Sequence, residues 1–377
     1  MRVQVLAGAL VLAISAAAQA GSVSASISGG HLYLYGDSGG SNLTVDSPAE
    51  GRIRVTGSVT AEGQDTVVNN QPNGTVILEG WTRGIFNYSY AGNDTLTFQG
   101  LTIRGPAHID LGDGDDGFII GDVLSAEEAA AAAATTSVMT TAKSLLVIGA
   151  RGADMVVING LFVEGAATLD LGEGADVAMV GTTMQNSNDV SVVIGQSCVI
   201  IPGNQADIVD ITATDVYANL TVDDAQDELT LNISDVNVDD SVFLYGTPAN
   251  DHVTTQNLNV TRLLKVISEG GDDTLQINGS SATTEVFPGL GNDAVELLDL
   301  STTRAHVYLD PGNDELSIQA GSYSYLYGYG AGGNDLFRLQ NASVGQAFLY
   351  GDGGTDSYVD GGGNRIGNLK LYSIENK

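Results

Sequence analysis

The sequence is short of two residue types that would narrow its function. Cys198 is the only cysteine in 377 residues, so no internal disulfide can form, and in an apolar stretch it is expected to be a small buried residue. Basic residues are few, because 14 Lys and Arg stand against 46 Asp and Glu, which gives a net charge of −32. Such a surface repels nucleic acid and anionic lipid, so neither is expected as a partner.

Long apolar runs are also missing, except near the N-terminus. Arg2 is followed by an apolar run from Val5 to Ala18, and small residues at Ala18 and Ala20 precede Gly21. This pattern predicts a signal peptide at residues 1–20. The run is too short for a permanent transmembrane anchor. We therefore expect a secreted or cell-surface protein, with retention in the periplasm as the alternative.

What the sequence does contain is a repeat. Gly- and Asn-rich segments, which we call corners, end in an aspartate about every 21 residues. Weaker versions are at Ser41 and Asp65, and the corner assigned to Asp227 lacks the inner glycines. The residues two and four places after most corners are apolar, as at Val295 and Leu297, which predicts a strand with one face in a core. Further apolar pairs later in each unit predict three strands per coil.

These features predict an all-β fold, a single right-handed parallel β-helix (β-solenoid) with about 20–22 residues per coil, over residues 21–364. Residues 365–377 lose the repeat and are expected to cap the last coil. Two longer gaps between corners predict insertions. A short α-helix is expected at about 125–143, where Ser125 and Glu128 form a capping box before an alanine run, and a loop at about 181–195.

The best-formed corners, such as Gly289-Leu-Gly-Asn-Asp293, resemble the RTX nonapeptide of secreted bacterial calcium-binding proteins. The resemblance implies calcium held between stacked turns by backbone carbonyls and corner carboxylates. The metal ligands that it implies are Asp116, Asp273, Asp293, Asp314, Asp335 and Asp356. The chain departs from the RTX pattern because only one turn per coil carries it. A metal-free alternative is a hydrogen-bonded ladder of stacked Asn292, Asn313 and Asn334.

Aromatic residues recur six places before several corners, and stacked coils would place their rings one above another. If the rings point inward they pack in the core, which is the interpretation that we favour from the sequence. If they point outward, Tyr308, Tyr329 and Tyr350 would offer a strip on which sugar rings could bind.

An apolar stripe is expected on the outside of three adjacent coils. It contains Ile119, Met155, Val157, Val177 and Met179, where other coils carry polar residues. We expect the inserted helix to cover this stripe, and self-association through it is the alternative.

No Ser/His/Asp arrangement, phosphate-binding loop or zinc-ligand cluster is visible, so no catalytic residue is assigned. We expect a secreted or cell-surface structural or adhesive protein, stabilised by calcium, whose partners are cell-surface or matrix components including polysaccharide. One alternative is a polysaccharide-active β-helix enzyme, which a groove joining carboxylates to Arg262 or Lys265 would favour. The other is a carbohydrate-binding rod, which exposed tyrosine rings would favour.

Overall fold

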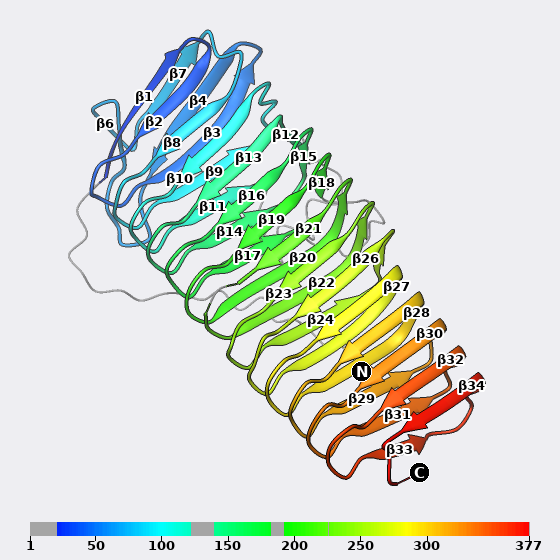
Figure 1. Cartoon of the computed structure of the whole chain (residues 1–377). Coiled ribbons are helices and arrows are strands. Elements are labelled where there is room, and N and C mark those ends of the chain that lie inside the picture. The colour runs from blue at the N-terminus through cyan, green and yellow to red at the C-terminus, as the bar shows by residue number, and fades with distance from the viewer. Residues whose placement is uncertain (1–20, 122–138, 182–191, 225, 377) are drawn as a thin grey trace.

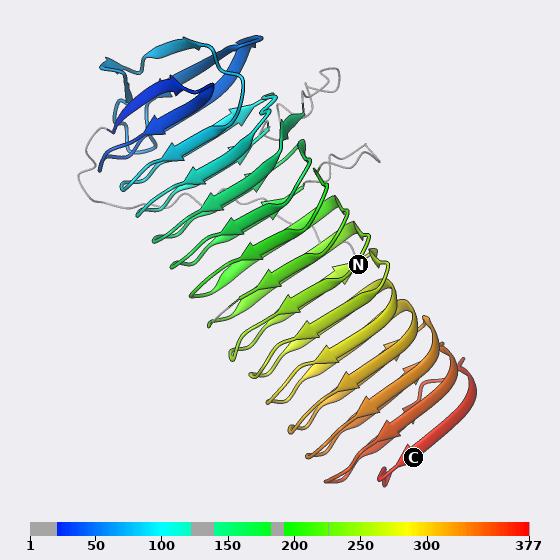
Figure 2. The ribbon, with the colours of Figure 1, turned by 45° about the horizontal axis from the view of Figure 1, so that its top comes forward.

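The structure is a computed structural model that describes residues 21–121, 139–181, 192–224 and 226–376 (Figure 1). These residues form strands and turns, and the strands stack into a β-solenoid of about 12 turns. The chain advances as an elongated rod from the N-terminal strands at one end to the C-terminal strands at the other (Figure 2). The prediction of an all-β parallel β-helix is therefore confirmed.

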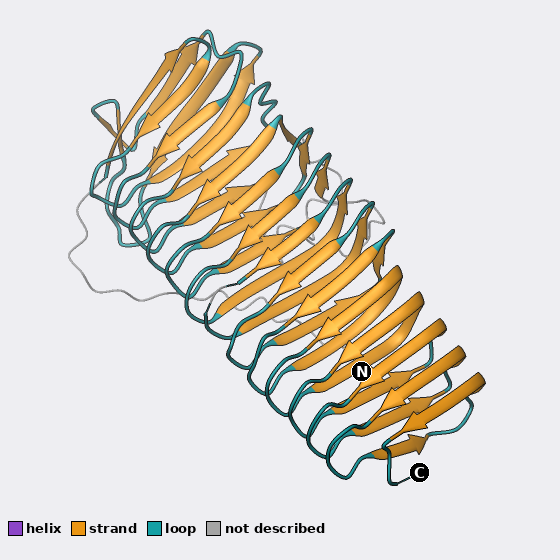
Figure 3. Cartoon of the chain, viewed as in Figure 1, coloured by secondary structure: helices purple, strands orange, loops and turns teal. Residues whose placement is uncertain are grey.

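Each coil contributes to three parallel ladders, which we name A, B and C (Figure 3). Ladder A precedes the aspartate corner and contains β2 (His31–Tyr35), β8 (Ile85–Tyr88), β10 (Pro106–Asp110), β13 (Ser144–Ile148), β16 (Ala167–Asp170), β19 (Cys198–Ile201), β21 (Leu220–Asp223), β23 (Val242–Tyr245), β26 (Leu263–Ile267) and the later parts of β27 (Thr274–Phe287), β28 (Ala294–Tyr308), β30 (Ser322–Tyr329), β32 (Ser343–Tyr350) and β34 (Arg365–Tyr372).

Ladder B follows the corner and contains β3 (Asn42–Ala49), β9 (Thr95–Gln99), β11 (Gly117–Ile120), β14 (Met155–Ile158), β17 (Val177–Val180), the first parts of β20 (Asp207–Val216), β22 (Leu229–Val238), β27 and β28, and β24 (His252–Gln256), β29 (Glu315–Gln319), β31 (Leu336–Gln340) and β33 (Ser357–Asp360). Ladder C closes the coil and contains β12 (Thr140–Ala142), β15 (Leu161–Val163), β18 (Val192–Ile194), β25 (Leu258–Val260) and parts of the longer strands. The three strands per coil agree with the sequence pattern.

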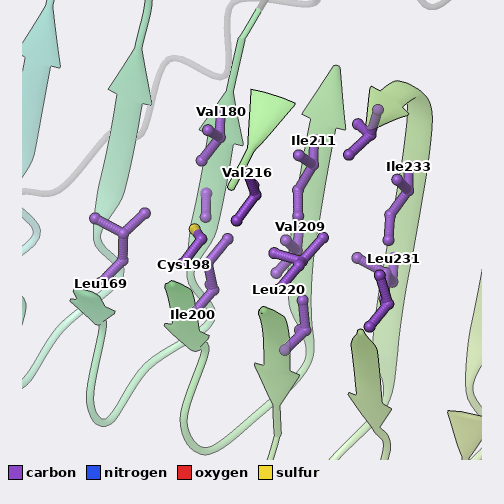
Figure 4. Packing of buried hydrophobic residues seen from close by; sticks show 14 of the residues in the cluster. Leu169, Val180, Cys198, Ile200, Val209, Ile211, Val216, Leu220, Leu231 and Ile233 are labelled. Carbon is purple, nitrogen blue, oxygen red and sulfur yellow. The ribbon is translucent and has the colours of Figure 1, made fainter. Parts of the chain in front are cut away.

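The core lies between the ladders and is built by alternation along each strand. Ile200 and Leu220 of ladder A lie beside Val209 and Ile211 of ladder B in the interior, and Leu169 occupies the equivalent place in the coil before Ile200 (Figure 4). Each is almost completely buried. Burial of one such side chain stabilises the fold by about 1.5–3 kcal/mol, and the repeat places equivalent residues in successive coils. Cys198 lies in this core, where burial raises the pKa of its thiol to about 12.

The N-terminal end differs from the predicted repeat. Here β1 (Ser22–Ser28) pairs antiparallel with β2, and β4 (Arg52–Ser58) pairs antiparallel with β3 and with β7 (Thr75–Glu79). β5 (Val67–Val68) and β6 (Gln71–Pro72) form a short hairpin. These strands occupy the outer edge of the first coil, which would otherwise be open to pairing with another chain. The corner predicted at Asp65 is wrong, because this residue is exposed in the antiparallel region.

The described ends of the two predicted insertions form strands. The described residues contain no helix, so the inserted helix is not observed. Residues 122–138 lie outside the described ranges, and the last part of the predicted helix, Thr140–Ala142, forms β12 because it completes ladder C beside Leu161–Val163. In the same way Val192–Ile194, which fall within the predicted loop, form β18 beside β15, whereas residues 182–191 are not described.

The last residues continue the stack. Within 365–377, the region predicted as a cap, β34 pairs in parallel with β32 over its whole length. Across the described ranges, no helix is long and apolar enough to cross a membrane.

Candidate functional site

The corner aspartates form one buried column along the solenoid. Each stands at the turn from ladder A to ladder B, with between 0% and 4% of its surface exposed. Its Oδ1 accepts the backbone N–H of the equivalent residue in the preceding coil, so that Asp293 donates to Asp314 at 2.8 Å and Asp314 donates to Asp335 at 3.0 Å. All six predicted metal ligands lie in this column: Asp116, Asp273, Asp293, Asp314, Asp335 and Asp356.

The column has a break and an end that the sequence did not indicate. Leu229, not Asp227, pairs with Asp207 and donates its N–H to Asp251 Oδ1 at 2.9 Å. Asp227 is exposed, and its Oδ2 accepts the Gln205 N–H. At the C-terminal end Glu375 replaces the aspartate, because its Oε2 accepts the Asp356 N–H at 2.9 Å.

The second carboxylate oxygen, Oδ2, is buried without a hydrogen-bond partner in most described members of the column: Asp94, Asp116, Asp154, Asp176, Asp207, Asp273, Asp293, Asp314, Asp335 and Asp356. At Asp154 this oxygen faces Gly149, where an added Cβ would lie 2.3 Å from Oδ2 and 2.2 Å from the carbonyl oxygen of Leu171. Two oxygens that face the same point repel each other unless a proton or a cation lies between them.

Burial raises the pKa of the column aspartates from Asp94 to Asp335 above the usual aspartate range. The pKa of Asp116 rises to about 9, that of Asp273 to about 8 and that of Asp314 to about 7. The neighbouring charges that add to these shifts belong to other acids, such as Asp115 beside Asp116 and Asp310 beside Asp314. No base offsets the desolvation of Asp116 and Asp273, so the neutral, protonated carboxyl is favoured at these two positions at neutral pH.

The unpaired Oδ2 at each corner suits a bound proton better than a calcium ion. Calcium takes roughly six to eight oxygen ligands, whereas a proton on Oδ2 needs one acceptor. In the described part of the chain, no group of three or more His, Cys, Asp or Glu side chains is placed to hold a metal ion. Calcium at the six aspartates is therefore supported by the RTX resemblance alone and stays a prediction.

Thermal unfolding in excess calcium, in magnesium and in a chelator tests this prediction. If the buried Oδ2 atoms carry protons and not an ion, we expect the three melting temperatures to agree. A rise that is specific to calcium and is lost in Asp314→Ala would contradict this expectation and place the ion in the column.

An exposed asparagine ladder runs beside the aspartates. Asn313 donates its backbone N–H and its Nδ2 to Asn292 Oδ1 at 3.1 and 3.0 Å, and Asn334 does the same to Asn313 at 3.0 Å in both bonds. The metal-free ladder predicted for these three residues is thus observed. It accounts for the recurring asparagine without any bound ion.

The tyrosine ladder points outward, so the inward packing favoured from the sequence is wrong. Val307 and Leu349, which precede Tyr308 and Tyr350, are fully buried, whereas the tyrosines are only partly buried. The Tyr308 and Tyr329 ring centroids are 4.7 Å apart and the rings differ by 3°, and Tyr329 and Tyr350 are 5.0 Å apart at 7°. Phe287 and Tyr372 extend this column at its two ends.

A second aromatic column lies beside the first and was missed in the sequence. His306 stacks on Tyr327 at 4.7 Å, and Tyr327 stacks on Phe348 at 5.1 Å. The signal was an aromatic residue eight places before the corner, two before each tyrosine. We name the two columns from β27 to β34 the C-terminal aromatic cluster.

A smaller group on β2, β8 and β10 forms the N-terminal aromatic cluster. Tyr33 stacks on Phe86 at 5.3 Å, Tyr35 stacks on Tyr88 at 5.5 Å, and His108 lies beside both rings of β8. Both clusters belong to ladder A, so they lie on the same outer face of the rod.

Comparison with protein-family models and with curated proteins finds no match. The aspartate column and the outward aromatic rings of ladder A are the two features of the rod that bear on its function.

The apolar stripe is assembled by ladder B. Met155 pairs with Val177 and Val157 pairs with Met179, while Ile119 lies beside Val157 in the adjoining coil. Met155 is 44% exposed and Val157 only 8%. Most of the segment expected to cover this stripe, residues 125–143, lies outside the described ranges, so coverage by that segment and self-association through the stripe both stay predictions.

The basic residues named for the enzyme alternative do not meet carboxylates in a groove. Arg262 pairs with Asp240 at 2.9 Å on the surface, and Lys265 lies 5.3 Å from the centre of the Phe287 ring. A shallow hollow of about 290 Å³ on ladder B contains Glu315 and Arg338, which pair with each other at 3.4 Å.

Proposed function

We propose that this protein is an exported adhesive rod that binds polysaccharide through the outward aromatic residues of ladder A. The observation that carries the proposal is the C-terminal aromatic cluster, in which Tyr308, Tyr329 and Tyr350 stack in one line on the outside of the rod. Aromatic rings give apolar contact area while tyrosine hydroxyls give hydrogen bonds, and a sugar offers C–H and O–H groups to match both.

Three further features support this proposal. Residues 1–20 have the pattern of a signal peptide, which suits a cell-surface or extracellular protein. A continuous aromatic surface is seldom left exposed without a partner. The stacked coils hold the tyrosines in fixed positions, so little side-chain entropy is lost on binding.

Replacing Tyr308, Tyr329 and Tyr350 together by serine is expected to abolish most polysaccharide binding. If each ring contributes about 1 kcal/mol, the triple variant loses roughly 100-fold in affinity. Co-sedimentation with insoluble neutral polysaccharides, cellulose and chitin among them, measures the change. Circular dichroism of each variant verifies the fold.

The matched control is Tyr217→Ser. Tyr217 is 55% exposed but lies outside the two aromatic clusters, so its removal tests whether any surface tyrosine suffices. Equal binding by the triple variant, Tyr217→Ser and the parent would refute the proposal. The rod would then be a structural component whose aromatic ladder serves only to stabilise stacking.

A further inference from the structure

The ring spacing of the C-terminal aromatic cluster is set by the coils. Successive rings in its first column are 4.6–5.0 Å apart and nearly parallel. This distance matches the strand spacing of about 4.8 Å, and it is comparable to the length of one sugar in an extended β-linked chain. A chain parallel to the axis of the rod would therefore meet equivalent groups at every sugar.

The two columns also have a suitable width. His306 and Tyr308 lie on the same strand with their ring centroids 6.2 Å apart, so each coil presents a row of two rings. Tyr327 with Tyr329 and Phe348 with Tyr350 repeat this row in the next two coils. One row can contact the two edges of a single sugar.

This face is nearly free of charge on a very acidic protein. From β27 to β34, only Glu285 and Lys370 carry a formal charge in the two columns, whereas the whole chain has a net charge of −32. Lys370 lies 5.4 Å from the centre of the Phe348 ring and so covers an aromatic face. A neutral ligand suits this surface, because an anionic one would meet the repulsive field of the rod.

The N-terminal aromatic cluster continues the same line. Its rows, Tyr33 with Tyr35 and Phe86 with Tyr88, occupy the same two outward columns of ladder A. The columns between the clusters contain aliphatic Leu146 and Val199 and the stacked pair Phe243 and Tyr245, with aspartates at intervals. At a strand spacing of about 4.8 Å, the two clusters are roughly 35 Å apart.

From this geometry we infer that the two aromatic clusters form one linear site for a single extended, neutral, β-linked polysaccharide chain lying along the axis of the rod, with one sugar to each coil. This inference rests on the proposed function and specifies its ligand and its direction. The C-terminal cluster is the main contact, and the N-terminal cluster adds a second contact on the same chain. A long polymer then gains avidity that a short oligosaccharide cannot have.

Calorimetric titration with neutral cello- and chito-oligosaccharides of increasing length tests the axial direction. Affinity is expected to rise severalfold with each added sugar up to about five, because five coils from β27 to β34 form the cluster, and then to level off. An affinity that levels off at two sugars would overturn the axial chain, since a chain crossing the strip meets only one row.

Replacing Tyr33 and Phe86 by serine tests the joint site. This variant is expected to bind a hexasaccharide like the parent but to bind long insoluble polymer about tenfold more weakly. Unchanged polymer binding would overturn the single linear site, and stronger binding of acidic than of neutral chains would overturn the neutral ligand. An affinity that does not depend on the length of the oligosaccharide would contradict only this inference. Failure to bind any polysaccharide would contradict the proposed function as well.

Discussion

Raising the pH from about 5 to about 9 is expected to lower the melting temperature of this protein by roughly 10 °C or more. The cause is the buried aspartate column. Burial raises the pKa of Asp154 and Asp176 to about 7 and that of Asp116 to about 9, and most of these carboxyls have one oxygen without a partner. Each ionisation in the folded rod places a charge in a dry turn beside other acids.

The direction of this pH effect follows from the pKa of each carboxyl in the folded and in the unfolded state. In the unfolded chain an aspartate has a pKa near 3.8, whereas in the folded rod that of Asp314 is about 7. The folded state therefore binds its protons more tightly than the unfolded state. The resulting stability is present in full below pH 3.8, decreases as the pH rises above that value, and is lost once the pH has passed the folded pKa values, between about 6 and 9.

Asp314→Asn is the matched variant for this effect. The amide keeps an Oδ1 that accepts the Asp293 N–H, but it cannot ionise. At pH 9 the variant is expected to melt above the parent, and the difference is expected to shrink as the pH falls and to vanish below about pH 3.8. Melting curves by circular dichroism across this range give the profile, and stability that increases with pH would show that the column holds carboxylates paired with cations.

The sequence was sufficient to predict the fold because the same constraint recurs in every coil. A core strand requires apolar residues at alternate positions after the corner, and pairs such as Val295 and Leu297 satisfy this requirement in successive coils. The corner requires a residue that accepts a backbone N–H from the preceding coil, and Asp335 and Asp356 do so. Repetition of two weak signals made the prediction strong.

The direction of the tyrosines could not be predicted, because alternation gives no contrast when both faces of a strand are apolar. Val307 and Leu309 alternate with His306 and Tyr308, so either set could have formed the core. In this part of ladder A the smaller aliphatic side chains are inside. The larger rings stack outside, where coil spacing suits offset aromatic contact.

The corner at residue 229 was misplaced for a related reason. Asp227 lies two residues before Leu229, and both choices leave apolar residues at the following alternate positions. Only the pairing of Leu229 with Asp207 identifies the true column position. The antiparallel strands around Asp65 were missed because they interrupt the repeat to cover the first coil, which requires tertiary information.

Gly333→Ala is expected to destabilise the folded rod by more than about 3 kcal/mol and to leave little soluble protein. Gly333 has a φ of +141°, and a Cβ there would lie 1.4 Å from the carbonyl oxygen of Gly312 in the preceding coil. That oxygen cannot move away alone, because the corners of adjacent coils are hydrogen-bonded through Asp314 and Asp335. Any shift would therefore have to spread along the stack.

The neighbouring glycine supplies the control. A Cβ at Gly332 would have its nearest contact at 4.0 Å, so Gly332→Ala is expected to change the free energy of unfolding by less than about 0.5 kcal/mol. Soluble yield and the urea midpoint of the two variants and the parent measure the difference. Similar midpoints for both variants would mean that the corners are loosely stacked. Loose stacking would let water reach the buried carboxyls of the aspartate column, because their burial depends on the close approach of successive corners. The pH dependence of the melting temperature expected above would then be absent as well.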